Sequence, residues 1–278
     1  MPYLMRGRNE AAVYFEQEIS LTRTDAFIRA WNQEHPAHRI DVFHVACWGL
    51  RRAFERTPST NRFVAGGRLY ERTGIWFSYA VKRKLETGAP FVVVKRRFDT
   101  DETFADMVEG MASAQADLKS GEDDRVEREL GLLMFFPGWV RRIIMAAIRG
   151  VDRLGMLPPS YIEHDPMFTS AFLANMASLG MPPVYHHLYE YGTCGVFGSL
   201  GRPVTDPGGP TSGPDRRRSM TVRWTYDERV EDGLAAWHSL RRFKQVVEDP
   251  LEAGLPAEAV ASGAIEPHPT PIDDPVLP

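Results

Sequence analysis

The chain has only two cysteines, Cys47 and Cys194, in 278 residues. Two thiols so far apart in sequence offer neither a disulfide framework nor a metal site, and we expect both to be buried. No apolar run is long enough to span a bilayer and the N-terminus lacks the order of a secretory signal, so we expect a cytoplasmic protein. The net charge of −4, without a basic stripe carrying aromatic residues, argues against nucleic acid as a partner.

The length fits one large α/β domain rather than two, and we place that domain at residues 1–250. Residues 251–278 are rich in Ala, Pro and Gly, which predicts a tail that is disordered or lies over a neighbouring subunit. The stretch 208–218 is a flexible loop by composition. Its three arginines are read more readily as a solvated charge run than as a phosphate site.

Hydrophobic periodicity predicts the order of the elements. Apolar residues recur at helical spacing over 23–33 and 42–56, and a third helix is expected over 103–119. Strands are expected near 68–82 and 90–96. Near the C-terminus an alternating run, 220–226, predicts a strand that is followed by a tight turn and a long helix, in which the apolar residues are Leu234, Trp237, Leu240, Phe243 and Val247.

The turn between that strand and that helix reads Asp227-Glu228-Arg229-Val230-Glu231-Asp232-Gly233. It resembles the Asp-His-Arg-x-x-Asp-Gly loop of two related groups, the dihydrolipoyl acyltransferases of 2-oxoacid dehydrogenase complexes and the chloramphenicol acetyltransferases. Asp227, Arg229, Asp232 and Gly233 match the pattern. Glu228 stands where the family has its catalytic histidine.

Further segments carry the resemblance in the same order. Residues 57–63 are similar to the family's Pro-x-x-Asn segment, 75–81 to its central strand, and 90–95 to the next strand without its usual proline. Ala177-Ser178-Leu179-Gly180 resembles the family's Ser-Asn-Leu-Gly. The resemblance covers roughly residues 10–250. It implies the chloramphenicol acetyltransferase-like fold, a mixed sheet flanked by helices, in a homotrimer whose active sites form between subunits.

The resemblance also implies a chemistry, in which an acyl group passes from a coenzyme A or lipoyl-type thioester to an acceptor. In the family the histidine is the general base, a nearby aspartate and arginine orient the loop, and the Ser-Leu-Gly region stabilises the oxyanion. Asp232, Arg229 and Ser178 keep candidates for the last two roles, with Gly233 completing the loop. No metal is implied. The chain shows no lipoyl domain, so a donor is expected to be free or brought by another protein.

The base position leaves two classes of function open. A glutamate serves as base near neutral pH only where its surroundings raise its pKa by about two units or more. One reading is therefore an acyltransferase with Glu228 or a nearby histidine as base. The alternative is an inactive pseudoenzyme that acts as a trimeric scaffold or acyl-ligand-binding protein.

His186 and His187 are the nearby candidates. The segment 186–192 is similar to the His-His-x-x-x-Asp-Gly motif of condensation domains, with Tyr191 in place of the aspartate. Those proteins are two-lobed and longer, so we interpret the pair as coincidental to that motif, although either histidine could face the active channel.

Residues 125–166 form a segment longer than the family has at this place. It contains an apolar helix over 139–149 with arginines at its ends. Three readings stay open: an insertion packed on the sheet or on another subunit, a cover over an acyl-chain tunnel, and, least favoured, a membrane-surface contact.

Overall fold

The computed structural model describes residues 4–5, 7–82, 91–120, 135–154, 156–206 and 217–251. The tail from 252, most of the 208–218 loop and residues 121–134 of the expected insertion therefore lie outside the described residues.

Seven strands of the described chain form one mixed sheet. Its order is β1 (Ala12–Ser20), β9 (Arg218–Asp227), β7 (Val196–Leu200), β6 (Ala171–Asn175), β4 (Ile75–Lys82) and β5 (Phe91–Phe98), with β8 (Val204–Thr205) beside β9. The three strands β4, β6 and β7 are parallel, and the other pairings are antiparallel. The expected mixed sheet is confirmed.

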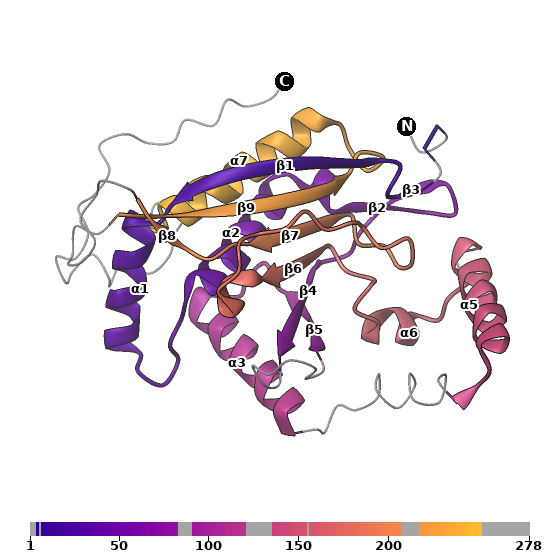
Figure 1. Ribbon diagram of the computed structural model, residues 1–278, viewed down its shortest axis with the longest axis horizontal. Helices are drawn as coiled ribbons and strands as arrows, with labels where there is room; N and C mark the ends of the chain where they lie inside the picture. The colour runs from indigo at the N-terminus through magenta and orange to yellow at the C-terminus, as the bar shows by residue number, and fades with distance from the viewer. Residues whose placement is uncertain are drawn as a thin grey trace.

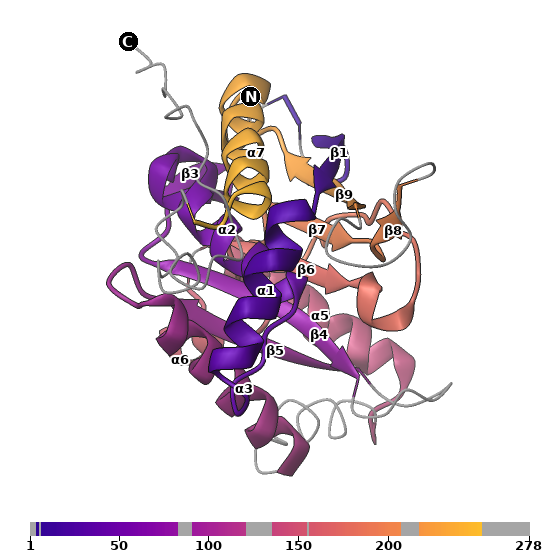
Figure 2. The same ribbon diagram turned by 90° about the vertical axis from the view of Figure 1, so that its left-hand side faces the viewer.

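Four helices cover one face of this sheet, as the two views show (Figure 1; Figure 2). They are α1 (Thr22–Glu34), α2 (Val42–Arg56), α3 (Phe104–Ser120) and α7 (Gly233–Glu248). The four predicted helical regions are thus confirmed. Helix α2 begins at a capping box in which the Asp41 carboxylate accepts from the backbone of Phe43 and His44.

The core between sheet and helices is centred on Trp224 of β9, which is fully buried. Its ring meets Phe243 of α7 edge to face, with 4.9 Å between centroids, and its Nε1 donates to Gln17 Oε1 at 3.1 Å. Gly198 of β7 makes room for this indole, because a Cβ there would lie 2.4 Å from the Trp224 ring. In α7 the same packing buries Leu240 and leaves the predicted apolar positions Leu234 and Trp237 exposed.

The opposite face of the sheet is crossed by residues 181–195, which form neither helix nor strand. A small second core of Phe172, Leu188, Cys194 and Phe197 lies beneath this segment. Cys47 and Cys194 are both buried and unpaired, as expected. Burial raises the pKa of the Cys194 thiol to about 11.

The remaining elements surround the sheet. After η1 (Pro58–Asn61), β2 (Arg62–Ala65) and β3 (Arg68–Glu71) form a separate hairpin. The region 68–82 holds β3 and β4, divided at Gly74 with φ of +85°. Next come α5 (Gly138–Arg153), α6 (Pro159–His164) and η2 (Met176–Leu179).

Helix α5 contains the predicted apolar helix and stands at one end of the molecule beside α6 (Figure 1). Its Trp139 and Ile143 are 66% and 60% exposed, so within one chain this part of the insertion is not packed on the sheet. None of the described helices has the length and apolar character needed to cross a membrane.

Candidate functional site

The loop between β9 and α7 is held by a buried ion pair. Asp227, at the end of β9, is fully buried and receives two charge-assisted hydrogen bonds from Arg229, Nε to Oδ1 at 2.9 Å and Nη2 to Oδ2 at 2.8 Å. The Arg229 amide also donates to Asp227 Oδ1 at 3.2 Å. Burial opposes the charge of Arg229, but these bonds outweigh it and raise its pKa. The arginine of the motif therefore fixes the start of the turn.

Asp232 lies at the other end of the loop. It is the N-cap of α7, and its Oδ1 accepts from the Ala235 amide at 2.9 Å. Arg229 forms its ion pair with Asp227, rather than with Asp232. Gly233 is the first residue of the helix, with open space where a Cβ would stand. The loop is thus oriented by Asp227 and Arg229 at its start and by the Asp232 cap at its end.

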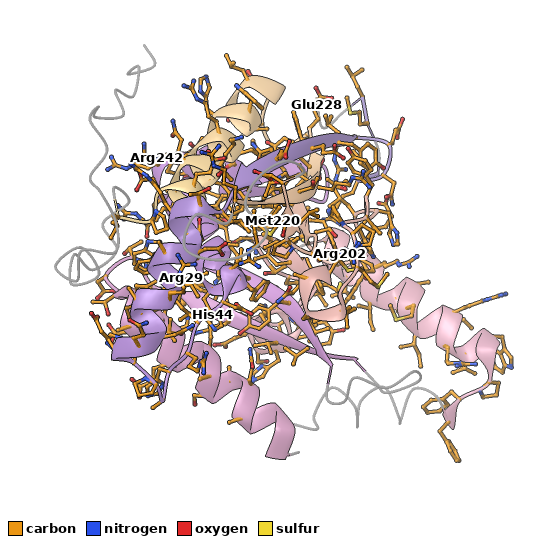
Figure 3. The ribbon with its side chains drawn as sticks, turned by 60° about the vertical axis from the view of Figure 1, so that its left-hand side comes forward. Arg29, His44, Arg202, Met220, Glu228 and Arg242 are labelled. Carbon is orange, nitrogen blue, oxygen red and sulfur yellow. The ribbon has the colours of Figure 1, made fainter. Side chains whose placement is uncertain are left out.

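Glu228 lies between these two anchors and is half-buried. Figure 3 shows it at the edge of the molecule, where β9 ends. Its backbone N–H donates to the Ala11 carbonyl at 3.0 Å, which fixes its main chain against β1. Its carboxylate forms no ion pair with the described residues. The two nearest arginines in sequence are engaged elsewhere, Arg229 with Asp227 and Arg223 with Glu16 at 2.6 Å.

A second arginine, Arg8, supports the loop from beneath. It is 5% exposed, and its guanidinium donates to four backbone carbonyls, those of Val64, Tyr189, Glu190 and Gly192. Its Nε lies 3.9 Å from Asp227 Oδ2. Burial lowers the pKa of Arg8, and the nearby Asp227 opposes that effect. Arg8 therefore joins the N-terminal segment, the β2–β3 hairpin and residues 189–192 to the loop that carries Glu228.

Ser178 lies at the other end of the sheet. It is exposed on η2, its Oγ donates to the Asn175 carbonyl at 2.7 Å, and its amide donates to Asn175 Oδ1 at 3.2 Å. The strand register pairs the end of β6 with the end of β7, whereas the end of β9 lies beside the start of β7. At ~3.3 Å per residue, the two positions are roughly 20 Å apart. One chain therefore does not bring Ser178 and Glu228 together.

The two histidines lie in the segment 181–195, between these ends. The ring of His186 stacks on Phe197 with 4.1 Å between centroids, and its backbone carbonyl accepts from Thr225 Oγ1 at 2.6 Å. Burial lowers the pKa of His186. His187 stacks on His186 and is exposed. The Nδ1 of His186 lies 2.7 Å from the His187 carbonyl oxygen, and within the described residues no group of three His, Cys, Asp or Glu side chains could hold a metal ion.

The fold defined by this sheet and these helices is that of the catalytic cores of dihydrolipoamide acetyltransferases. A probable dihydrolipoamide acetyltransferase from Listeria monocytogenes 4b F2365 matches over 85% of this chain and 84% of its own, with a TM-score of 0.56 and 14% identity. The cubic core of the pyruvate dehydrogenase multienzyme complex matches over 91% and 86%, with a TM-score of 0.61 and 13% identity. A scan of family models and a search of curated proteins find no match.

A third similar structure bears on the site. It is the dihydrolipoamide acetyltransferase of Azotobacter vinelandii, investigated for the role of one serine, one histidine and one asparagine in its catalytic mechanism. It matches over 91% of this chain and 86% of its own, with a TM-score of 0.61 and 13% identity. These matches confirm the expected fold. At such identities the likeness extends to the fold alone.

Proposed function

We propose that the chain is an acyltransferase that moves an acyl group from a coenzyme A or lipoyl-type thioester to an acceptor, with Glu228 at the position of the base. The observation that supports the proposal is that Glu228 lies on an anchored loop with its carboxylate unpaired among the described residues. Its main chain is fixed on both sides, and its carboxylate forms no ion pair with a cation among the described residues. A carboxylate in that condition is able to accept a proton.

The spacing of polar residues supports the assignment. In the Azotobacter vinelandii enzyme the histidine and the asparagine stand four residues apart. Glu228 and Asp232 have the same spacing, and Ser178 supplies a serine on a separate element. On this reading Glu228 occupies the base position and Ser178 the oxyanion position.

The proposed site requires more than one copy of the chain. Because roughly 20 Å separates Ser178 from Glu228 along the sheet, the serine that faces Glu228 belongs to a neighbouring chain. We place the two in a homotrimer, with the base loop of one chain against η2 of the next. The Ser178 hydroxyl turns from its bond with the Asn175 carbonyl toward the substrate.

The reaction then follows with its protons balanced. The Glu228 carboxylate takes the proton from the acceptor's thiol or hydroxyl, and the acceptor adds to the thioester carbonyl. The Ser178 hydroxyl donates to the oxyanion of the tetrahedral intermediate. When the intermediate collapses, the carbon–sulfur bond breaks, and the departing thiolate takes the proton back from Glu228.

Ordinary pKa values give the free-energy cost of transferring a proton from a thiol acceptor to Glu228. Moving a proton from a thiol to a typical glutamate carboxylate is uphill by about 6 kcal/mol, against about 3 kcal/mol to a typical histidine. The test compares acyl-CoA consumption by the native chain with that by Glu228→Gln and Glu228→His. We expect the native chain to turn over, the Gln variant to lose roughly 10²-fold or more, and the His variant to retain activity.

The second candidate function is a pseudoenzyme, a trimeric scaffold or acyl-ligand-binding protein. Hydrogen bonds within the chain made by the other two motif residues favour this candidate. The Ser178 hydroxyl donates to the Asn175 carbonyl, and the Asp232 carboxylate caps its own helix. The same assay separates the two. If the native chain shows no turnover and the Glu228→His variant does, the protein has kept the acyltransferase fold but lost the catalytic base.

A further inference from the structure

A cavity of about 470 Å³ opens between the β2–β3 hairpin and the segment that runs from the end of α5 through α6. Its apolar walls come from Phe63, Leu154, Leu157, Ile162 and Phe168. The β9–α7 loop contributes none of its lining. The volume is in the range of sites that hold small organic molecules.

Arg72 lines this cavity and has no ion-pair partner among the described residues. Its Nη2 donates to the Thr193 carbonyl at 3.1 Å and to Thr193 Oγ1 at 2.9 Å, and its guanidinium carbon lies 4.6 Å from the centroid of the Phe63 ring. Its Nε is buried without an acceptor. No carboxylate of the described chain lies within ion-pair distance. Asp152 lines the same cavity without pairing with it.

An arginine in such surroundings is costly to the apo protein. Burial lowers the pKa of Arg72 to about 10, with Arg8 adding to the effect. The Lys95 ammonium lies nearby over the Trp76 ring, and its pKa falls to about 8 through burial and then through the charge of Arg72. Buried cations are ordinarily matched by an anion, and the part of the chain that the structure describes provides none at Arg72.

We propose that this cavity binds a small apolar carboxylate, whose carboxylate pairs with the Arg72 guanidinium and whose carbon skeleton packs against Phe63, Ile162 and Phe168. The carboxylate accepts from the buried Nε of Arg72, with Arg68 as a second cation on the lining, and the apolar walls suit a hydrocarbon body. A phosphate fits less well, because it has no carbon skeleton to pack against these apolar walls. The site is independent of the chemistry at Glu228.

The test is calorimetric titration of the full chain with octanoate, with its uncharged counterpart octanamide, and with inorganic phosphate. We expect octanoate to bind at least tenfold more tightly than octanamide, and phosphate not to bind. Arg72→Met should weaken octanoate binding at least tenfold and leave octanamide binding within about twofold. The matched control is Arg29→Met, which removes an exposed arginine on α1, remote from α5 and α6, and should leave octanoate binding unchanged (Figure 3).

Two further measurements distinguish a specific loss of octanoate binding from misfolding of the variant. Arg72→Met removes a buried unpaired charge and should not lower the melting temperature, and octanoate should raise the melting temperature of the native chain. Ala65→Trp, which fills the cavity but keeps Arg72, should also abolish octanoate binding. Equal binding of octanoate and octanamide, full binding by Arg72→Met, binding of phosphate, or no binding of octanoate would each overturn the proposal.

Discussion

Among the polar residues of the β9–α7 loop, we expect substitution of Asp227 to lower the unfolding free energy most, and the near-isosteric change Asp227→Asn tests this. The carboxylate is fully buried, receives two bonds from the Arg229 side chain, and lies 3.9 Å from Arg8. Asparagine keeps the shape but leaves two buried guanidinium groups facing a neutral amide. Removing one partner of a buried ion pair costs about 3–5 kcal/mol of unfolding free energy.

The assay is urea unfolding of the native chain and of two Asp→Asn variants. The matched control is Asp99→Asn, because Asp99 pairs with Arg97 at 2.9 Å on the surface, where both side chains are more than half exposed. An exposed pair contributes less than about 1 kcal/mol. A loss at Asp227 no greater than that at Asp99 would refute the reasoning, since it would mean that the buried network does not stabilise the loop.

Two predictions concern the neighbouring elements and the assembly. Asp232→Ala should cost about 1 kcal/mol in urea unfolding through loss of the α7 cap, whereas Asp232→Ser should retain most of the stability; equal losses in both variants would contradict the capping role. If the site forms between chains, Glu228→Gln and Ser178→Ala, each inactive alone, should recover roughly one quarter of native acyl-CoA turnover when refolded together in equal amounts, by random assortment of subunits. No recovery in a mixed trimer would place the two residues in separate sites.

The helices could be predicted because each buries one stripe of its own sequence. In α2 the apolar residues Phe43, Cys47, Leu50 and Phe54 recur at helical spacing, and all of them are buried against the sheet. The division of residues 68–82 into two strands, β3 and β4, was harder to predict from the sequence. The four residues of β3 are exposed and pair only with β2, so their pattern carries no burial signal that would separate them from β4.

The candidate site was only partly accessible to prediction. Asp227, Arg229 and Asp232 were found through the motif, but their partners were not. Arg8 was missed because its acceptors are backbone carbonyls 56 to 184 residues away, and carbonyls are common to every residue type. Arg72 was missed for a similar reason, since its partner Thr193 lies 121 residues away. Buried arginines that bond to the backbone leave no pattern in the sequence.

The geometry of the sheet links these observations. Arg8 and Asp227 fix the loop at one end of β7, and Ser178 lies at the other end, so the chain carries Glu228 on an anchored loop and the Ser178 hydroxyl at opposite ends of one sheet. Between them, β1 and the segment 181–195 expose Tyr14, Val184 and Tyr185, with Tyr14 and Tyr185 in edge-to-face contact at 5.5 Å. Exposed apolar side chains gathered in this way are typical of surfaces that other chains cover. A neighbouring copy of the chain on this surface is the kind of contact that the proposed site between subunits requires.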